Sequence, residues 1–203
     1  MTVSRETAAF GERLPLAERY AEILATAGVQ RGLIGPREVD RLWDRHLLNC
    51  AAPVVRVPEN ATVADVGAGA GLPGLVWAIA RPDLHVTLIE PLLRRATFLE
   101  EVSEELGLDN VAVLRARAEE VSEKYDVVTA RAVAALDKLA RWCMPLVKPG
   151  GLLLALKGRS AADEVESARA TLKRLKAGDI VVATYGQDWG LEVPTTVVEV
   201  QRR

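Results

Sequence analysis

The sequence predicts an α/β protein with a mostly parallel, seven-stranded sheet, an antiparallel C-terminal hairpin and an N-terminal helical cap. Over the middle of the chain, short β-branched and aliphatic runs alternate with segments of helical periodicity, which is typical of parallel strands joined by crossover helices. The last two apolar runs have no helix between them and must therefore pair antiparallel. The first quarter of the chain has helical periodicity only, which predicts the cap.

The expected elements follow in order along the chain. Helical periodicity runs from residue 6 to about 33, with Gly28 expected to end the helix, and Pro36 is expected to open a second helix. The expected strands are 62–66, 85–90, 111–114, 126–130, 152–156, 180–184 and 196–200. The expected intervening helices begin at about 73 and span 92–106, 134–146 and 161–175. We therefore expect residues 1–58 to form the cap and 59–203 the main domain, as a single compact unit.

Composition indicates an ordinary globular enzyme-sized domain. Hydrophobic residues make up 49% and charged residues 27% of the 203 residues, and the net charge is −2. That charge argues against a general nucleic-acid coat protein, because such binding comes mostly from neutralised phosphates. An RNA enzyme whose basic residues gather on one face remains compatible with it.

The cysteine pattern and the absence of targeting signals indicate a cytoplasmic protein. Cys50 and Cys143 lie in apolar stretches without metal-type spacing, so we expect buried free thiols and no metal site. No signal-peptide pattern is present, and no apolar run approaches the roughly 20 residues of a membrane span.

A glycine-rich turn follows the first expected strand, in the run DVGAGAGLPG at 65–74. Gly67, Gly69 and Gly71 lack a Cβ, so the backbone there can approach a ligand closely. Part of the run also matches the dinucleotide fingerprint GxGxxG. However, a pyrophosphate needs N–H donors at the start of the helix, and Pro73 removes one. S-adenosylmethionine has no phosphate, so this proline and the terminal hairpin together favour it as the cofactor.

Glu90 ends the second expected strand, about 20 residues beyond the turn. Both cofactor classes place a carboxylate there to accept hydrogen bonds from ribose hydroxyls. The residues therefore predict a Rossmann-like, class I S-adenosylmethionine-dependent methyltransferase.

Residues 65–74 resemble the first motif of the ribosomal small-subunit RNA guanine-N7 methyltransferases, the RsmG or glucose-inhibited division protein B family. Further matching motifs are WDRHLLN at 43–49, RAEE at 117–120, TARA at 129–132 and ALKG at 155–158. They occur in the family's order at compatible spacing, so the resemblance covers about Tyr20 to Gly158. The chain departs from the pattern at Asn49-Cys50, where many relatives have Asp-Ser.

The resemblance implies roles for residues around one pocket. Gly67 and Leu72 would contact the cofactor, Ala118 and Glu119 would lie against the adenine, and Arg131 would line the pocket. Together with the fold-based positions, the expected cofactor-binding set is Gly67, Gly69, Gly71, Leu72, Glu90, Ala118, Glu119 and Arg131. The expected RNA-binding set is Arg45, His46, Arg94, Arg95, Lys157 and Arg159.

Two of these residues also have structural interpretations. His46 lies on the apolar side of its helix and is equally consistent with a buried histidine bonded to backbone. Arg131 at a strand end is also consistent with a structural ion pair. The candidates for a direct part in the reaction are His46, Arg131 and Lys157.

The family reaction is methyl transfer from S-adenosylmethionine to N7 of a guanine in a loop of 16S ribosomal RNA, at family site guanine 527 of the 530 loop, leaving S-adenosylhomocysteine. N7 carries an in-plane lone pair and no proton, so the attack needs no general base. The lack of a catalytic triad or metal cluster in the sequence fits this chemistry. The resemblance implies 16S ribosomal RNA, within the small subunit or its precursor, as the partner. The sequence has no heptads and no obvious apolar edge, which predicts a monomer.

Three alternatives remain at the sequence level. A methyltransferase of the same fold acting on a small molecule would suit the acidic isoelectric point. An NAD(P)-dependent oxidoreductase would use the GxGxxG match. A cofactor-binding regulator without catalysis is the third.

Overall fold

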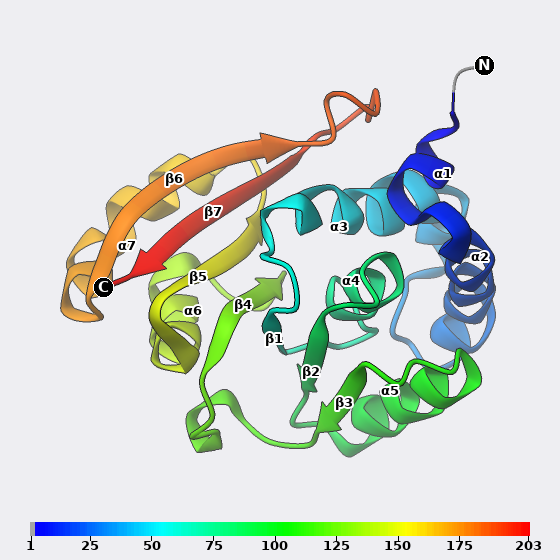
Figure 1. Ribbon diagram of the computed structural model, residues 1–203, viewed down its shortest axis with the longest axis horizontal. Helices are drawn as coiled ribbons and strands as arrows, with labels where there is room; N and C mark the ends of the chain where they lie inside the picture. Colours follow the sequence, from blue (N-terminus) through cyan, green and yellow to red (C-terminus); the bar gives the residue numbers. More distant parts are fainter. Residues whose placement is uncertain (1–2) are drawn as a thin grey trace.

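The computed structural model describes residues 3–203 and has a seven-stranded sheet at its centre (Figure 1). Its strands are β1 (Thr62–Val66), β2 (His85–Ile89), β3 (Val111–Leu114), β4 (Tyr125–Arg131), β5 (Val147–Lys157), β6 (Ala177–Tyr185) and β7 (Thr195–Arg202). The strand order is β3-β2-β1-β4-β5-β7-β6. The first five strands are mutually parallel, and β7 runs antiparallel to both β5 and β6. The predicted parallel sheet with its terminal hairpin is confirmed.

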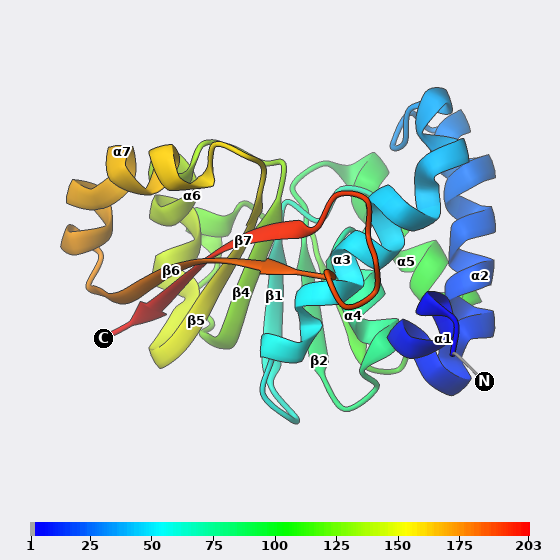
Figure 2. The same ribbon diagram turned by 90° about the horizontal axis from the view of Figure 1, so that it is seen from above.

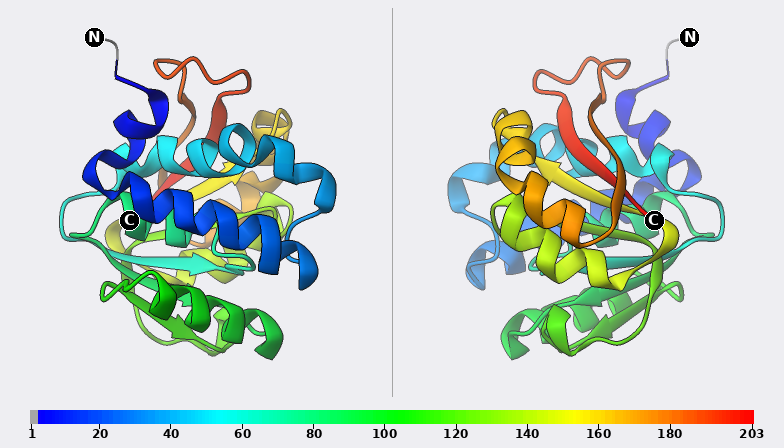
Figure 3. Two further views of the ribbon diagram at one scale, coloured as in Figure 1. Left: turned by 90° about the vertical axis from the view of Figure 1, so that its right-hand side faces the viewer. Right: turned by 90° about the vertical axis from the view of Figure 1, so that its left-hand side faces the viewer.

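Helices cover both faces of the sheet, as right-handed crossovers require. They are α4 (Gly74–Ala80), α5 (Leu93–Glu105), α6 (Leu136–Cys143) and α7 (Ala161–Arg174), with short 3₁₀ turns η6 (Ala118–Glu120) and η7 (Met144–Leu146). Helices α4 and α5 pack with the cap on one face, and α6 and α7 lie on the other (Figures 2 and 3). Each face has its own apolar core, and the sheet separates the two.

The cap is a series of short helices rather than two long ones. Its elements are α1 (Arg5–Phe10), η1 (Gly11–Arg13), α2 (Leu14–Ile23), η2 (Leu24–Gly28), η3 (Pro36–Arg41), η4 (Trp43–Leu48), α3 (Asn49–Ala51) and η5 (Ala52–Arg56). The predicted single first helix is wrong, because Gly11 adopts a φ of 53° and interrupts it. The predicted helix end at Gly28 is also wrong, because helical backbone continues through Val29 and Gln30, and the chain turns only at Gly32, which has a φ of 68°.

The cap shares its apolar core with the main domain. Leu24 and Leu47 from the cap and Trp77 from α4 are fully buried in one cluster. The indole Nε1–H of Trp77 donates to the carbonyl oxygen of Cys50 at 2.7 Å, which fixes α3 against α4. This packing supports the expectation of a single compact unit.

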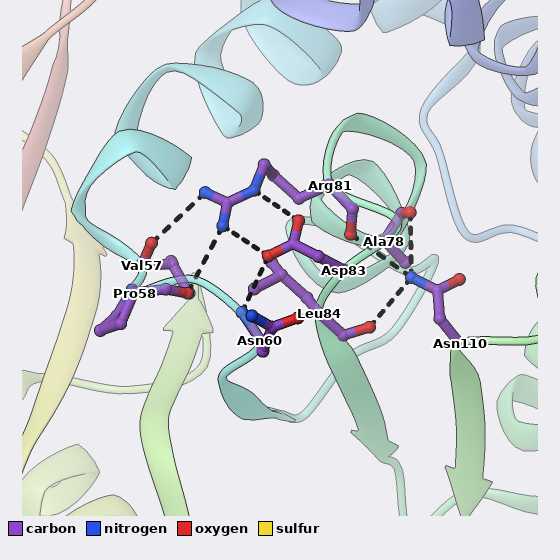
Figure 4. A network of polar contacts seen from close by, with 8 residues as sticks. All are labelled: Val57, Pro58, Asn60, Ala78, Arg81, Asp83, Leu84 and Asn110. Atoms are coloured by element: carbon purple, nitrogen blue, oxygen red, sulfur yellow. Dashed lines mark hydrogen bonds and ion pairs between the residues drawn. The ribbon is translucent and has the colours of Figure 1, made fainter.

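A polar network joins the amino ends of the first three strands (Figure 4). The guanidinium of Arg81 pairs with Asp83 at 2.7 Å and also donates to the carbonyl oxygen of Val57 at the end of the cap. Asp83 accepts from the backbone N–H of Asn60, while the Asn110 amide donates to the carbonyl oxygens of Ala78 in α4 and of Arg81 and Leu84 before β2. The network stabilises the sheet at the amino ends of its strands, opposite their carboxyl ends.

Candidate active site

The glycine turn between β1 and α4 uses its N–H groups inside the protein. Gly67 donates to the carbonyl oxygen of Ile89 at 2.8 Å, and Gly69 donates to Oε2 of Glu90 at 2.9 Å. Gly67 and Gly69 have φ of 71° and 58°, the left-handed region that favours glycine. Within residues 3–203, the carbonyl oxygens of Gly67 and Gly69 accept no hydrogen bond. The turn therefore offers acceptors, which suit a cationic group better than a phosphate.

The first N–H of α4 is also occupied. Gly74 donates to Oδ2 of Asp65 at 2.8 Å, and Pro73 before it has no N–H to offer. A Cβ at Gly74 would lie 2.4 Å from Leu88 and 2.7 Å from the Asp65 carboxylate, so this glycine lets the helix start pack on β1 and β2. The start of α4 has no free donor for a pyrophosphate at this position.

A first cavity of about 620 Å³ opens at the carboxyl ends of β1, β2 and β4. Its lining is Leu33, Ile34, His46, Gly67, Ala68, Gly69, Ala70, Leu72, Glu90, Pro91, Leu92, Arg95, Arg131, Ala132 and Val133. The Glu90 side chain is held from both oxygens, since Oε1 accepts from the N–H of Leu92 at 3.1 Å and Oε2 from Gly69. Each oxygen keeps a lone pair for a ligand hydroxyl.

A second cavity of about 780 Å³ adjoins the first. It lies between the cap, the ends of β4 and β5, and the loop from β6 to β7. Its lining is Asp40, Arg41, Asp44, Arg45, Asn49, Arg131, Ala132, Leu156, Lys157, Gly158, Arg159, Glu164, Glu192, Val193 and Thr195. Arg131 and Ala132 line both cavities, so the end of β4 forms the wall between them.

The guanidinium of Arg131 is held by neutral acceptors. It donates to Sγ of Cys50, to the carbonyl oxygen of Arg45 and to Nδ1 of His46, each at 3.0 Å. No carboxylate within residues 3–203 forms an ion pair with it, so the structural ion pair considered from the sequence is wrong for this part of the chain. Its charge stays available at the junction of the two cavities.

His46 sits between Arg131 and a carboxylate. Its Nε2 lies 3.0 Å from Oε2 of Glu38, and its side chain is only 12% exposed. Burial, and next the charge of Arg131, lower the pKa of His46, so the ring is neutral at pH 7. The interpretation as a histidine bonded to backbone is wrong, because both ring nitrogens contact side chains.

The structure brings together most of the residues that the sequence singled out. In the first cavity it places Gly67, Gly69, Leu72, Glu90, Arg131, His46 and Arg95, and in the second Arg45, Lys157, Arg159 and again Arg131. Four others line neither cavity: Gly71, Ala118, Glu119 and Arg94. Their predicted contacts stay predictions.

These four residues lie in different surroundings, some packed in the interior and some exposed. A Cβ on Gly71 would lie 2.4 Å from Leu75, so this glycine permits close packing of the turn on α4. Ala118 is buried and Glu119 exposed on η6, beyond the end of β3. Arg94 is exposed in the first turn of α5.

Lys157 is more enclosed than an RNA-contacting lysine is expected to be. Its side chain is 9% exposed, and Nζ donates to Oε2 of Glu164 at 2.8 Å and to the carbonyl oxygen of Ala134 at 2.6 Å. The ammonium therefore ties β5 to α7 at the wall of the second cavity. Arg159, two residues later, is exposed on the same wall.

Sequence reasoning did not single out several residues of the site. Leu33 and Ile34 from the cap complete the first cavity, and Glu192 and Val193 from the β6–β7 loop complete the second. The sequence carries no local signal for these contacts, because they depend on how the cap and hairpin pack on the sheet. Glu38 had a weak signal, since it precedes His46 by eight residues, little more than two helical turns.

The comparison with known families establishes to which family the chain belongs. The model of the GidB family, described as rRNA small subunit methyltransferase G, matches residues 13–188. The chain belongs to this family. A Nocardioides relative named "Ribosomal RNA small subunit methyltransferase G" is 60% identical over 191 residues, covering 93% of this chain and 76% of the relative. One from Salinispora arenicola with the same name is 58% identical over 202 residues, covering 95% and 83%.

Solved structures confirm the fold independently. An S-adenosylmethionine-dependent methyltransferase from Aquifex aeolicus superposes with a TM-score of 0.57 at 18% identity, covering 84% of this chain and all of that one. A predicted O-methyltransferase from Agrobacterium tumefaciens gives a TM-score of 0.60 at 18% identity, covering 77% and 80%. The predicted class I methyltransferase fold is confirmed. Membership of the family confirms a methyltransferase that depends on S-adenosylmethionine and excludes the NAD(P) oxidoreductase.

The residues of the first cavity fit this cofactor. The carbonyl oxygens of Gly67 and Gly69 suit its ammonium group, and the Glu90 carboxylate suits the ribose hydroxyls. A Cβ at Gly67 would lie 2.9 Å from Val133, so only glycine keeps this part of the wall open. None of the helices in residues 3–203 combines the length and the apolar character that a membrane span requires.

Proposed function

We propose that this chain transfers a methyl group from S-adenosylmethionine to N7 of a guanine in a loop of 16S ribosomal RNA, at the family site guanine 527. The observation that carries the proposal is the pair of adjoining cavities that share Arg131 and Ala132. The first cavity suits the cofactor and the second suits an acceptor base. Only the end of β4 separates the two, so a methyl group could pass directly from one to the other.

In this proposal the first cavity holds the cofactor. The carbonyl oxygens of Gly67 and Gly69 bind the ammonium group, and Glu90 binds the ribose hydroxyls. Leu72 forms part of the apolar wall. Gly71 supports the turn from behind, and Ala118 with Glu119 reach the adenine edge beyond β3. When bound, the cofactor supplies an electrophilic methyl group on a sulfonium.

The second cavity would receive the guanine and its neighbouring phosphates. Arg45 and Arg159 are exposed there, and Arg131 contributes a charge without a carboxylate partner in the described chain. Guanine N7 needs no general base, so the protein's task is to align N7 with the methyl group. Asp40 and Glu192 line the same cavity and would stabilise the positive charge that the purine gains.

Arg94, Arg95 and His46 extend this surface toward the first cavity. Arg95 lines it, and Arg94 precedes Arg95 in the exposed first turn of α5. An RNA loop that enters the second cavity would pass these side chains. Because side chains cannot read the deep groove of paired A-form RNA, the guanine must be unpaired or exposed.

The acceptor atom is tested with matched RNA. Loop transcripts with guanine or 7-deazaguanine at the target position are incubated with the protein and labelled S-adenosylmethionine, alongside small subunits lacking the modification. We expect label in the guanine RNA or subunit and none in the 7-deaza transcript. Label on a different atom, mapped by mass spectrometry, would refute the N7 assignment, and label only on small molecules would refute the RNA substrate.

The cofactor assignment has its own test. S-adenosylhomocysteine at about 100 times its Kd should stabilise the fold by roughly 2.7 kcal/mol in thermal unfolding, whereas NADH should leave it unchanged. Methyl transfer to RNA would also exclude a regulator without catalysis.

We further propose that the chain acts as a monomer in the cytoplasm, with the cap of residues 1–58 and the domain of 59–203 moving as one body. The substrate would be the small subunit or its precursor. Light scattering of the purified protein tests the oligomeric state, and a mass corresponding to a dimer would refute it.

A further inference from the structure

Glu38 is an acidic residue of η3 that no motif singled out. Its Oε2 lies 3.0 Å from Nε2 of His46 and 3.6 Å from Nε of Arg45. The opposite ring nitrogen of His46, Nδ1, lies 3.0 Å from Nη2 of Arg131. Three side chains, from η3, η4 and β4, thus form one line that ends at the wall between the two cavities.

The contacts determine which ring nitrogen of His46 carries the proton. A guanidinium has only donors, so Nδ1 must accept from Arg131 and be unprotonated. A carboxylate has only acceptors, so Nε2 must carry the hydrogen and donate to Glu38. His46 is therefore neutral with its hydrogen on Nε2. A hydrogen on Nδ1 would face the Arg131 donors and push the guanidinium away.

The charges around the ring agree with this arrangement. His46 faces Glu38 from η3, Arg45 from its own helix and Arg131 from β4. The hydrogen bond from His46 lowers the pKa of Glu38, so the carboxylate stays ionised near pH 7. Burial, followed by the charge of Arg131, lowers the pKa of His46. Neither group changes its charge near pH 7.

We propose that Glu38 is a positioning residue that, through the Nε2–H tautomer of His46, holds the Arg131 guanidinium between the two cavities. The other two acceptors of Arg131, Sγ of Cys50 and the carbonyl oxygen of Arg45, are neutral as well. The positive charge of Arg131 is thereby oriented without being neutralised. Its use in methyl transfer to RNA rests on the proposed function, whereas the orientation itself does not.

The orientation is tested by nuclear magnetic resonance on the full chain. The protein has two histidines, so a His85→Gln variant, which changes an exposed residue of β2, assigns both rings. Two-bond ¹H–¹⁵N spectra at pH 7.5 should show His46 neutral with its hydrogen on Nε2. Glu38→Gln, whose amide oxygen still accepts, should retain this tautomer and the Arg131 side-chain signal. Glu38→Ala releases the ring from η3, so the ring and Arg131 should separate, which gives a tautomer mixture and a shifted Arg131 side-chain signal.

Methyl transfer then tests the consequence. Glu38→Ala should lower kcat roughly ten- to hundredfold, as small misplacements of an aligned group do, with an unchanged unfolding midpoint. Glu38→Gln should stay within about threefold of the unmodified protein. Glu12→Ala and Glu12→Gln are the matched controls, since Glu12 is exposed on η1 and should leave both readouts unchanged.

The outcomes separate the two proposals. A hydrogen on Nδ1 of His46 in the unmodified protein, or full activity of Glu38→Ala, would overturn the positioning role. If the tautomers behave as expected while the unmodified protein methylates no ribosomal RNA, the proposed function fails and the positioning of Arg131 by Glu38 stands.

Discussion

Two glycines of the turn region differ in what a methyl group would meet. At Gly69 the nearest atom to an added Cβ is the Gly67 oxygen at 3.7 Å, although the φ of 58° disfavours other residues. At Gly74 the added Cβ would collide with Leu88 and Asp65. Gly69 is therefore limited by its backbone conformation, and Gly74 by packing.

This difference predicts that alanine at Gly69 mainly weakens ligand binding, whereas alanine at Gly74 mainly lowers stability. Gly69→Ala should cost about 1 kcal/mol of unfolding free energy from left-handed strain, but should weaken S-adenosylhomocysteine binding because it adds a methyl to the cavity wall. Gly74→Ala should cost about 3 kcal/mol through overpacking. Urea denaturation and calorimetric titration measure the two effects. Equal stability of the two variants would contradict this assignment.

Asp65 predicts a pH dependence of stability. Its carboxyl is fully buried, and Oδ1 has no partner within residues 3–203. Burial raises its pKa from 3.8 to about 7, so the folded state holds this proton more tightly than the unfolded chain. The unfolding free energy should therefore fall as pH rises between the two values.

Asp65→Asn isolates this effect, because the contribution of His46, which has the opposite sign, is common to both proteins. Asp83 and Asp126, with pKa values of about 2, do not titrate above pH 5. From pH 5 to pH 8 the stability of the unmodified protein should fall by about 2 to 3 kcal/mol relative to Asp65→Asn. Urea denaturation at both pH values measures it, and parallel curves would contradict the buried ionisation.

Lys157 and Arg159 form a matched pair two residues apart. Lys157→Met would leave the Glu164 carboxylate without its ammonium partner and should cost about 3 kcal/mol. Arg159→Met, at an exposed site, should leave the unfolding midpoint unchanged but weaken RNA binding and reduce its salt dependence. Thermal unfolding and RNA titrations at two salt concentrations distinguish them. If Lys157→Met kept its stability but bound RNA more weakly, the main role of Lys157 would be RNA contact and not stabilisation of the fold.

At the scale of elements, the cap holds the glycine turn in place. Tyr20 of α2 is fully buried and donates its hydroxyl to the carbonyl oxygen of Ala70 at 2.7 Å. Fifty residues separate the two, so a helix of the cap supports a loop that lines the first cavity.

Tyr20→Phe should therefore affect stability and binding together. It leaves a buried carbonyl oxygen without this donor, which should cost about 1 to 2 kcal/mol, and should weaken S-adenosylhomocysteine binding. Tyr125→Phe is the matched control, since that hydroxyl contacts Glu123 at the amino end of β4, away from the glycine turn. Equal effects on binding by both variants would show that the turn does not depend on α2.

The strands and crossover helices could be predicted because each depends on local sequence: a buried run must form a strand, and an apolar stripe a helix. The limits of β5 could not. Gly150 and Gly151 indicate a turn, yet both lie within Val147–Lys157, where the register with β4 shifts between Tyr125 and Val127. A bulge is set by the neighbouring strand, which the local sequence does not reveal.

The site divides in the same way. The turn and Glu90 could be predicted, since their spacing from the strands determines where they lie. The contacts between Glu38, His46 and Arg131 could not, because they join cap and sheet across long sequence separations. The same holds for Tyr20, whose hydroxyl only reaches the turn once α2 has packed against α4.

For the whole molecule, the central question is whether the cap is an independent domain. Phe10 and Leu47 of the cap share one apolar cluster with Trp77 of α4 and Val197 of β7. Removing the cap would expose that cluster to water over a large area. We therefore expect the complete fold, and not the sheet with its four crossover helices alone, to be the stable unit.

This predicts that residues 59–203 do not fold without the cap. The full chain should unfold in one transition, with tryptophan fluorescence and far-ultraviolet circular dichroism coinciding. Fluorescence reports on cap, core and hairpin alike, because Trp43, Trp77, Trp142 and Trp189 lie in η4, α4, α6 and the β6–β7 loop. The isolated 59–203 fragment should lack a cooperative transition and bind no S-adenosylhomocysteine. A fragment that binds it would show that the cap is added to a self-sufficient domain, and would restrict the cap's part to Leu33, Ile34 and the residues around Arg131.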